Sequence, residues 1–484
     1  MNVLAIDQGT SGTKAIVVDG EGSVLSIAEV TVRPVYLPGG GVEQDPNELL
    51  DSVLLAGRRA IAEAGVPISA VALANQGETV LAWERSTGRP LSAAIVWQDR
   101  RSASICTELT VHASVFAQRT GLVLDPYFSA PKMAWLRRHV TREGVVTTTD
   151  TWIVHHLTGE FVTDVTTASR SLVLGLDSVD WDVELLDHFG LAAEQLPRLV
   201  ACDEIVGTTS AFGPAVPVVG LIVDQQAALL AEGCLEPGAA KCTYGTGAFL
   251  LANTGTSAVR STSGLTTSVA WRVGGETRYC VDGQVYAAAS AVRWLRDLGI
   301  ISDETTIDAA AAADSGGVLF SPALAGLAAP WWRPDATAAF TGMSLATTGA
   351  NLVRAVIDSI AAQIAALATV VEVDTGCAIT RLRADGGLTN SRALMQAQAD
   401  LLQAPVEIYP SGHATALGAA ALARLGIDPV LSLETVTGGW TPAATFEPRM
   451  SADRAAGFMA SWGECVARMM PPSPMSDDRP LEVS

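Results

Sequence analysis

The opening of the chain alternates between short apolar runs and loops rich in glycine and hydroxyl residues. Val3–Ile6 is wholly apolar, residues 7–13 read Asp-Gln-Gly-Thr-Ser-Gly-Thr, and Ala15–Val18 is apolar again. Short apolar runs bounded by turn residues are typical of buried strands. We therefore expect the chain to begin with two buried strands joined by a polar loop.

Helical and strand-like patterns alternate after this hairpin. Pro46–Ala64 carries apolar side chains at helical spacing, and Asp45 is a suitable N-cap for such a helix. Further strands are expected at 70–74, 80–83 and 93–97, with another helix after Asp99. This alternation predicts an α/β fold.

A second strand–loop–strand unit lies near the middle of the chain. The mostly apolar run Ala239–Thr243 precedes the loop Tyr244–Gly247, and Ala248–Leu251 is apolar again. Two units of the same shape, half a chain apart, predict two similarly built domains that face one cleft. We expect an N-terminal domain at 1–233, a C-terminal domain at 234–470 and a disordered tail at 471–484.

Composition and charge narrow the range of functions. The 484 residues are 49% hydrophobic, which favours two domains with substantial cores. The net charge of -20 repels phosphate backbones, so no nucleic-acid partner is expected. The seven cysteines form no C-x-x-C pair, and the apolar stretch Val216–Leu230 is interrupted by polar residues. We expect a cytoplasmic protein with reduced thiols and no membrane partner.

Residues 7–12 have the composition of a phosphate-binding turn. Glycines such as Gly12 let backbone N–H groups converge on an anion, Thr10 and Ser11 add hydroxyl donors, and Lys14 adds positive charge. Asp7, at the end of the expected strand, is placed to hold a hydrated Mg²⁺, which prefers carboxylate and phosphate oxygens. Taken alone, the segment is explained equally well as a hairpin turn with an Asx motif.

Two further loops have similar chemistry. Thr246 lies between two glycines in the second hairpin, and residues 383–391 read Arg-Ala-Asp-Gly-Gly-Leu-Thr-Asn-Ser at the expected end of a strand. A Gly-Gly pair lets a flat ligand approach the backbone, and Asn390 or Ser391 can hydrogen-bond to it. Each loop alone is ordinarily a turn, whereas three in one α/β chain favour a nucleotide. Neither a P-loop nor a Rossmann motif is present.

A candidate general base follows the apolar run Val216–Val223. Asp224 and then Gln225 come at the C-terminal end of this expected strand, where α/β folds bind ligands. A carboxylate there can accept a hydroxyl proton during in-line phosphoryl transfer. The alternative is that Asp224 caps a helix at Gln225–Ala231, and the sequence alone gives both interpretations about equal weight.

Four more residues suit a polyol pocket. Glu78, Trp97, Tyr127 and Phe249 lie at the ends of expected strands or in loops. The hydroxyls of a polyol need acceptors and its carbons need an apolar wall, which these residues supply together. On spacing alone, Trp97 and Phe249 are better explained as core residues.

Several segments resemble one family closely. They read AIDQGTSGTKAIVVD, AIVWQDRR, TGLVLDPYFSAPK, DQQAAL, TYGTGAFLLANTG and WLRDLG, and residues 127–138 and 338–358 resemble two signature segments. From about Asn2 to about Phe446 the chain resembles the FGGY carbohydrate kinases, and within them the glycerol kinases. The resemblance implies a two-domain, actin-like α/β fold (the sugar kinase–Hsp70–actin type) whose central interdomain cleft closes over ATP and substrate.

The resemblance also implies roles for single residues. Asp224 corresponds to the catalytic base of the family, and Asp7 to the carboxylate near Mg²⁺. The positions that match polyol-contacting residues are Glu78, Trp97, Tyr127, Asp224, Gln225 and Phe249. The positions that match nucleotide-contacting residues are Thr10, Ser11, Gly12, Lys14, Thr246, Gly387 and Ser391.

Gly77 departs from the family pattern at the substrate site. Glycerol kinases typically read Asn-Gln-Arg-Glu-Thr where this chain reads Asn-Gln-Gly-Glu-Thr, and the family's arginine donates to substrate hydroxyls. Loss of a charge-assisted hydrogen bond typically costs about 1.5–3 kcal/mol. Gly77 is therefore expected to weaken glycerol binding and to open volume for a longer polyol or a ketose.

Other departures concern the nucleotide and regulation. Ala289 and Arg293 stand where many relatives have Gly and Gln, so we expect an altered nucleotide affinity, with Arg293 within reach of a phosphate or the ribose. The loop Thr208–Pro217 lacks the Gly/Arg pattern that binds fructose 1,6-bisphosphate in some relatives, and it has no histidine for phosphotransferase control. We expect neither form of regulation.

These observations lead to one principal hypothesis and two alternatives. The principal hypothesis is a kinase that uses ATP and Mg²⁺ to phosphorylate a primary hydroxyl of a small polyol such as glycerol. The first alternative is an FGGY kinase for a larger polyol or ketose (a tetritol, erythrulose, xylulose or ribulose), because of Gly77. The second is a non-catalytic, actin-like ATP switch, against which the polyol pocket argues. In each case we expect a homodimer or a higher homo-oligomer.

Overall fold

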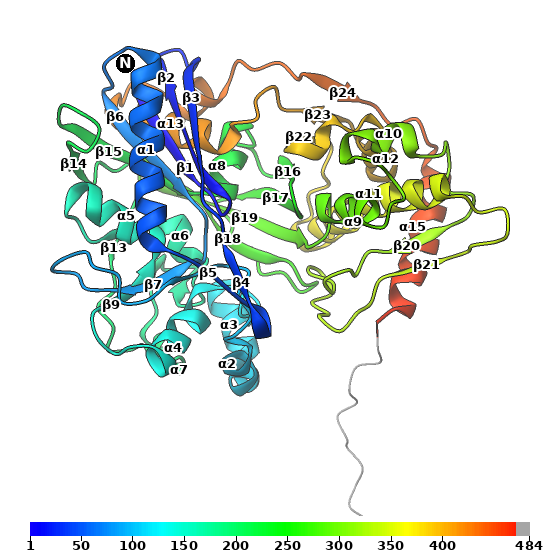
Figure 1. Cartoon of the computed structure of the whole chain (residues 1–484), viewed down its shortest axis with the longest axis horizontal. Coiled ribbons are helices and arrows are strands. Elements are labelled where there is room, and N and C mark those ends of the chain that lie inside the picture. Colours follow the sequence, from blue (N-terminus) through cyan, green and yellow to red (C-terminus); the bar gives the residue numbers. More distant parts are fainter. Residues whose placement is uncertain (471–484) are drawn as a thin grey trace, which may run out of the picture.

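The opening hairpin forms part of a six-stranded sheet in the first of two lobes (Figure 1). In the computed structural model, which describes residues 1–470, β1 (Val3–Gln8) pairs antiparallel with β2 (Gly12–Val18) and parallel with β6 (Ala70–Asn75). The strand order is β14-β15-β6-β1-β2-β3, completed by β3 (Val24–Thr31), β14 (Gly207–Thr209) and β15 (Val216–Val223). The disordered tail predicted at 471–484 lies outside the described residues.

The loop predicted at 7–13 is shorter in the structure. Asp7 and Lys14 are paired across β1 and β2, so only residues 9–11 remain for the turn. The polar side chains did not prevent strand pairing, because an antiparallel ladder bonds through the backbone.

Alternate side chains of β1 enter two different cores. Leu4 and Ile6 pack on the side of α1 (Pro46–Ala64), whereas Val3 and Ala5 pack on the side of α13 (Ala414–Ile427). Because successive side chains of a strand point to opposite faces, the two helices cover the two faces of this sheet. The helix predicted at 46–64 is confirmed with its predicted bounds, and Asp45 caps it.

The second lobe contains a seven-stranded sheet built on the second hairpin. β16 (Ala240–Tyr244) pairs antiparallel with β17 (Ala248–Gly255) and parallel with β22 (Leu382–Asp385). The order is β18-β19-β17-β16-β22-β23-β24, completed by β18 (Thr266–Val273), β19 (Glu276–Val285), β23 (Val406–Ile408) and β24 (Ala444–Phe446). Both sheets therefore join an antiparallel hairpin to a parallel strand, which is the similarity of shape that the sequence predicted.

The most apolar helix, α11 (Gly349–Thr375), is a core helix of the second lobe. Its most apolar window has a mean hydropathy of 1.7, enough by composition to cross a membrane, but 72% of that window is buried inside the protein. It packs against α12 (Arg392–Leu402) and β17. Its apolar character is therefore explained by burial in this core.

Helix α8 (Asp224–Ala231) lies between the two sheets. It contacts β15 and β6 of the first sheet and also β16, β17 and β18 of the second. The helix was predicted to begin at Gln225, whereas Asp224 is its first residue. The candidate base thus stands at the N-terminal end of the helix that joins the two lobes.

The remaining elements complete the two lobes. A five-stranded sheet in the first lobe contains β4 (Val35–Leu37), β5 (Gly41–Gln44), β8 (Ala94–Ile95), β7 (Val80–Trp83) and β9 (Val145–Thr148). Short paired strands are β10 (Val162–Asp164), β13 (Arg198–Val200), β11 (Leu174–Gly175), β12 (Asp180–Trp181), β20 (Leu319–Ser321) and β21 (Ala339–Thr341). The other helices are α2 (Ala103–Glu108), α3 (Ala113–Thr120), α4 (Ser129–His139), α5 (Thr149–Thr158), α6 (Val165–Ser169), α7 (Val183–His188), α9 (Ala289–Asp297), α10 (Ile307–Ala310), α14 (Leu433–Thr437) and α15 (Ala452–Arg468).

Candidate active site

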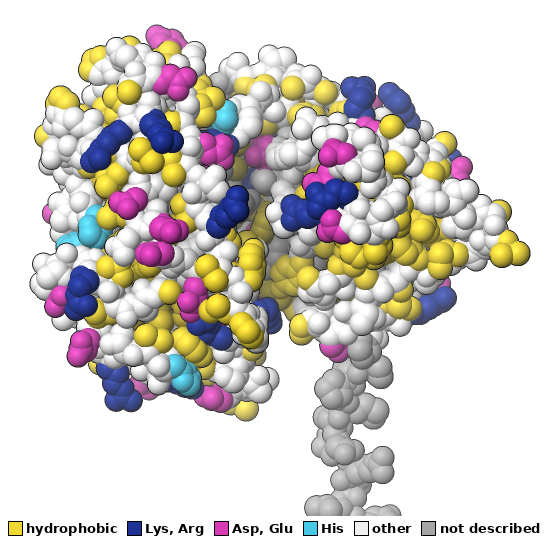
Figure 2. All heavy atoms as spheres, in the orientation of Figure 1, with side chains coloured by type: hydrophobic (Ala, Val, Ile, Leu, Met, Phe, Trp, Pro, Cys, Tyr) yellow, Lys and Arg dark blue, Asp and Glu magenta, His cyan; other side chains and the backbone are white. Residues whose placement is uncertain are grey.

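Figure 2 shows a hollow between the two lobes. Most of the predicted site residues follow strands whose ends are aligned by parallel pairing. In the first sheet the pairing of Gln8 with Asn75, and of Asn75 with Val223, brings the ends of β1, β6 and β15 to one edge. In the second sheet Thr243 is paired with Asp385, which aligns the ends of β16 and β22. The loops that follow these five strands carry most of the predicted residues, as expected for ligand sites in α/β folds.

Asp224 keeps one carboxylate oxygen free at the N-terminal end of α8. Its Oδ1 accepts the backbone N–H of Gln225 at 2.7 Å, while its Oδ2 makes no hydrogen bond with any described residue. Burial raises its pKa from 3.8 to about 7, with further increases from Asp7 and Glu78, and the Gln225 N–H and Lys241 oppose the shift. A carboxyl group with this pKa gains and loses its proton near neutral pH, which suits a general base.

Two more carboxylates lie in the cleft near Asp224. Burial raises the pKa of Asp7 from 3.8 to about 6; Lys14 opposes this, while Glu29 and Asp385 add to it. Burial also raises the pKa of Asp385, and its Oδ1 is buried without a hydrogen-bond partner among the described residues. The mutual influence of these carboxylates concentrates negative charge at one place, which a cation would stabilise.

These carboxylates fit a Mg²⁺ ion of the kind that binds together with phosphates. No group of three or more His, Cys, Asp or Glu side chains within residues 1–470 forms a cage for a metal. Mg²⁺ commonly uses one or two carboxylates and completes its shell with water and phosphate oxygens. Asp7 and Asp385 provide such a pair of donors.

Lys241 supplies a buried positive charge to the cleft and was not among the residues predicted from the sequence. Its side chain is fully buried in β16, and its Nζ donates to Gln225 Oε1 at 2.6 Å and to Thr243 Oγ1 at 2.7 Å. It also lowers the pKa of Asp224 and Asp385. A lone lysine in an apolar strand is the signal that would have identified it, because a buried ammonium needs partners.

Glu78 takes part in an ion network that joins the two lobes. Arg170 Nε donates to Glu78 Oε1 at 2.6 Å, and Arg170 Nη1 donates to Asp282 Oδ1 at 2.7 Å on β19. The three side chains are only 5–6% exposed. The backbone of Glu78 has a positive φ of 57°, an unfavourable conformation for this residue type that places its side chain in the cleft. Neither Arg170 nor Asp282 was predicted, because no sequence pattern connects them to Glu78.

Three aromatic rings form a wall beside these charges. The ring of Trp97 meets Tyr127 edge to face at 5.6 Å between centroids and meets Phe249 in the same way at 6.2 Å. The buried Nζ of Lys132 donates to the carbonyls of Tyr127, at 2.5 Å, and of Phe128, at 2.6 Å, which fixes this segment. One pocket is lined by residues from both lobes: Glu78, Tyr127, Arg170, Val223, Asp224, Gln225, Gln226, Phe249, Leu251 and Asp282. The predicted polyol residues are thus brought together, with Trp97 behind the rings that face the pocket.

Val223 limits the space beside Gly77 on one side. A Cβ added at Gly77 would lie 2.9 Å from Val223 Cγ2, closer than real Cβ contacts. The sequence could not reveal this approach, since Gly77 lies in the loop between β6 and β7 whereas Val223 is the last residue of β15.

The turn predicted to bind phosphate in the first lobe is held in place by the residues around it. Gln44 Nε2 donates to the Thr10 carbonyl at 2.7 Å, and the Gly9 N–H donates to the Gly12 carbonyl at 3.0 Å. Ser11 is exposed at the tip. A Cβ at Gly12 would lie 2.7 Å from the Val30 carbonyl oxygen, so this position requires glycine. The turn presents hydroxyl and N–H groups to the cleft on a fixed backbone.

In the second lobe, the residues that match nucleotide-contacting positions also lie close together. The Thr246 carbonyl accepts the Ala288 N–H at 3.0 Å, which joins its turn to the start of α9, where Ala289 and Arg293 lie. Gly386 has a φ of 93°, and a Cβ there would lie 2.5 Å from the Tyr244 carbonyl oxygen. The Gly386–Gly387 turn therefore packs directly against the end of β16, beside the Thr246 turn.

Two of these residues have partners within the protein. Arg293 is 3.6 Å from Glu304, which also pairs with Arg296. Ser391 accepts the Leu394 N–H at 3.1 Å as the N-cap of α12, and its hydroxyl also bonds to Asp308. Ser391 thus has a structural role at its position.

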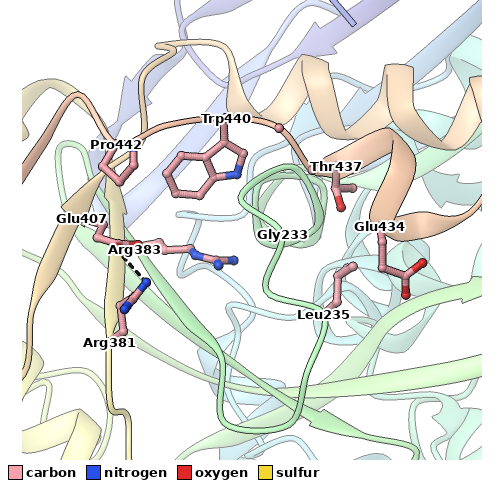
Figure 3. Close-up of a pocket in the computed structure, with 11 residues that line it drawn as sticks. Gly233, Leu235, Arg381, Arg383, Glu407, Glu434, Thr437, Trp440 and Pro442 are labelled. Atoms are coloured by element: carbon pink, nitrogen blue, oxygen red, sulfur yellow. Dashed lines mark ion pairs between the residues drawn. The ribbon is translucent and has the colours of Figure 1, made fainter. Parts of the chain in front are cut away.

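A second cavity lies outside this cleft. It occupies about 330 Å³ where the segment after α8 meets the loop after α14, and none of its described lining residues is a predicted site residue (Figure 3). Arg381 pairs with Glu407 at 2.8 Å, and the Arg383 guanidinium lies 5.2 Å from the ring centroid of Trp440. Both arginines of this cavity are therefore already engaged.

The two-lobed fold, with carboxylates and Gly-rich turns facing one cleft, is that of a small-molecule kinase. Residues 2–231 match the N-terminal domain, and residues 240–426 the C-terminal domain, of the FGGY family of carbohydrate kinases. The chain belongs to this family. It is a carbohydrate kinase, and its fold confirms the predicted two-domain α/β architecture.

Full-length relatives are glycerol kinases. The chain is 43% identical over 486 residues to glycerol kinase of Alkalilimnicola ehrlichii, covering 96% of this chain and 98% of the relative. It is 40% identical over 488 residues to glycerol kinase 2 of Thermotoga maritima, covering 97% and 98%. Glycerol kinase of Plasmodium falciparum with ADP has a TM-score of 0.90 at 31% identity, covering 97% of this chain and 98% of that chain. Xylulose kinase of Rhodospirillum rubrum shares the fold with a TM-score of 0.86 at 24% identity, covering 97% and 99%. The chain is of the glycerol kinase type.

Proposed function

We propose that this chain transfers the γ-phosphoryl group of ATP to a primary hydroxyl of glycerol, giving glycerol 3-phosphate and ADP. The observation that carries the proposal is Asp224, whose free Oδ2 and pKa of about 7 occur in a pocket lined by acceptors and aromatic rings. Similarity to glycerol kinases over 96% of the chain supports glycerol as the acceptor.

Asp224 acts as the general base in this proposal. Its carboxylate accepts the proton of the primary hydroxyl as the hydroxyl oxygen attacks the γ-phosphorus in line. The bond from the γ-phosphorus to the bridging oxygen breaks, and ADP leaves. Because the chemistry is largely positioning and charge neutralisation, the protein contributes by holding acceptor and phosphate in line.

The polyol is held by the residues opposite Asp224. Glu78 and Gln225 offer acceptor and donor groups to hydroxyls. The rings of Tyr127 and Phe249, which Trp97 supports, contact the carbon chain. Combining a few polar groups with an apolar wall fixes the orientation of a small ligand.

ATP is held between the turns of the two lobes. The phosphates are contacted by Thr10, Ser11, Gly12, Lys14 and Thr246. The adenosine lies between α9 and the Gly387 turn, beside Ala289, Arg293 and Ser391. Asp7, with Asp385 as second carboxylate, would hold Mg²⁺, which would supply charge neutralisation to the phosphates. The pairing of Arg293 with Glu304 favours a role in shaping this surface over direct contact with a phosphate.

Closure of the two lobes excludes water from the reaction. The active residues come from both sheets, and α8 touches both, so movement of one lobe against the other changes the distance between the polyol and the phosphates. Exclusion of water limits wasteful hydrolysis of ATP.

The alternative acceptor is a longer polyol or a ketose, which was expected from the absence of a side chain at Gly77. Val223 borders this space on one side. We further propose a cytoplasmic location, which suits the free cysteines, six of them buried, and a homodimer or higher homo-oligomer.

A coupled assay of ADP release tests the proposal. The protein with ATP and Mg²⁺ is presented with glycerol, erythritol, the threitols, dihydroxyacetone, xylulose and ribulose. We expect the highest kcat/KM with glycerol. A higher kcat/KM with a ketose would refute glycerol as the acceptor, and ATP hydrolysis without stimulation by any of these compounds would refute polyol phosphorylation.

A further inference from the structure

Val223 is an apolar residue in the lining of the polyol pocket. It is the last residue of β15, is 3% exposed, and lines the pocket beside Asp224. Its backbone is fixed by pairing with Asn75 of β6. A Cβ added at Gly77 would lie 2.9 Å from Val223 Cγ2, so side chains at the two positions would compete for this space.

Arg170 brings a guanidinium to the same pocket from another part of the chain. It follows α6, lines the pocket, and lies 5.5 Å from the ring centroid of Tyr127. Its bonds to Glu78 and Asp282 use two of its five N–H groups, and the others make no hydrogen bond with any described residue. N–H groups beside a pocket and without partners are suited to acceptor oxygens of a ligand.

From these contacts we infer that Arg170 donates to a substrate hydroxyl and that Val223 restricts the substrate to three carbons. The inference rests on the proposed function, since it requires a polyol in this pocket. Arg170 then supplies a charged donor to the pocket, and the side chain of Val223 supplies an apolar boundary. The acceptor class is a three-carbon polyol, in preference to a tetritol or pentulose.

The length restriction is tested with Val223→Ala. Removing two methyl groups frees space for about one more carbon, and a single methylene typically changes discrimination by roughly 10–200-fold. We expect the ratio of kcat/KM for erythritol to that for glycerol to rise by about tenfold or more. The matched control is Val219→Ala, which truncates a buried valine on the same strand that does not line the pocket. An unchanged ratio in Val223→Ala, or an equal rise in the control, would overturn the restriction.

The shared volume is tested with a double-mutant cycle. Gly77→Ala alone places a Cβ against Val223 and is expected to lower kcat/KM for glycerol. In the Val223→Ala background the clashing methyl is absent, so the same substitution is expected to have little effect. Equal loss in both backgrounds would show that the two residues do not share this volume.

The donor role of Arg170 is tested with substrates that lack one hydroxyl. Arg170→Gln is expected to raise the KM for glycerol by about tenfold or more, because a charge-assisted bond is lost. Of 1,2- and 1,3-propanediol, one lacks the hydroxyl that Arg170 contacts. For that substrate, Arg170→Gln should change the KM much less. Arg170→Lys provides a second variant that keeps the charge in case the glutamine variant does not fold. Equal loss with all three substrates would leave Arg170 a purely structural residue and overturn the inference.

The outcomes also separate this inference from the proposed function. If the unaltered protein phosphorylates no polyol, both fail. If it phosphorylates glycerol and the variants leave the substrate ratios unchanged, only the inference fails.

Discussion

The indole N–H of Trp97 donates to the hydroxyl oxygen of Thr10 across 2.9 Å. Trp97 supports the aromatic wall of the polyol pocket, and Thr10 lies in the turn proposed to hold the phosphates. This bond therefore connects the polyol pocket to the proposed phosphate-binding turn within one lobe. It orients the threonine hydroxyl, since an oxygen that accepts one hydrogen bond directs its own proton elsewhere.

Trp97→Phe is expected to weaken the use of ATP more than the binding of glycerol. The ring is kept, so the apolar wall survives, but Thr10 loses the donor that orients it. A single hydrogen bond contributes about 0.5–1.5 kcal/mol, which predicts a rise of roughly two- to tenfold in the KM for ATP. Trp181→Phe is the control, because Trp181 donates to the Pro197 carbonyl at 2.9 Å away from the cleft. A larger change in the KM for glycerol than in that for ATP would contradict the prediction.

The activity is expected to fall as the pH drops below about 7. Asp224 must be ionised to accept a proton, and its pKa in the free protein is about 7. Well below this pH, kcat/KM for glycerol should decrease about tenfold for each pH unit. A profile of kcat/KM from pH 5 to pH 9 measures this, with substrates and Mg²⁺ held fixed. Activity independent of pH below 7 would show that the base is a different group.

Asp224→Asn is expected to be more stable than the unaltered protein at high pH. The pKa of Asp224 rises from 3.8 to about 7 on folding, so the unfolded chain releases its proton first and stability falls as the pH rises between these values. The asparagine variant lacks this penalty. Its advantage should therefore grow from pH 5 to pH 7 by about 1.4 kcal/mol per unit and then level off. Denaturant unfolding at pH 5 and pH 8 measures the difference, and a constant difference would refute the raised pKa.

Lys241→Met is expected to lower both stability and turnover. The ammonium group is fully buried and bonds to Gln225 and Thr243, so its removal leaves these partners, and the negative charge of Asp385, without compensation. Breaking a buried charged interaction typically costs about 3–5 kcal/mol. Lys14→Met is the control for stability alone, since the one hydrogen bond of Lys14 to a described residue is long, at 3.5 Å to the Gly412 carbonyl. Equal unfolding midpoints for Lys241→Met and the unaltered protein would contradict this role.

Much of the fold could be predicted from local pattern. The strand Val216–Val223 and the helix Pro46–Ala64 were predicted with their observed bounds, because each carries a continuous periodic signal and clear end residues. The bounds of β2 were less predictable, since Gly12 and Thr13 are polar loop residues by composition but pair through the backbone. The ends of elements depend on partners that lie elsewhere in the chain.

The candidate site could likewise be predicted only where local sequence pattern marks its residues. Asp224 could be identified because it directly follows a buried strand, and Asp7 because it lies at the end of one. Arg170 reaches Glu78 only through the packing of α6 beside the first sheet, so nothing in its local sequence indicates the contact. The approach of Val223 to the position of Gly77 could not be predicted, because Val223 ends β15 whereas Gly77 lies in the loop after β6. Residues that follow a strand are predictable, whereas contacts between distant segments are not.

The central claim is that Asp224 takes the proton of a polyol hydroxyl during transfer from ATP. The most direct measurement compares Asp224→Asn with the unaltered protein in glycerol-dependent ADP release and, separately, in equilibrium binding of ATP. Because general-base catalysis contributes roughly 10²–10⁴-fold, we predict a loss of turnover in that range with ATP affinity nearly unchanged. Retained turnover, or a loss of ATP binding as large as the loss of turnover, would contradict the assignment of Asp224 as the base.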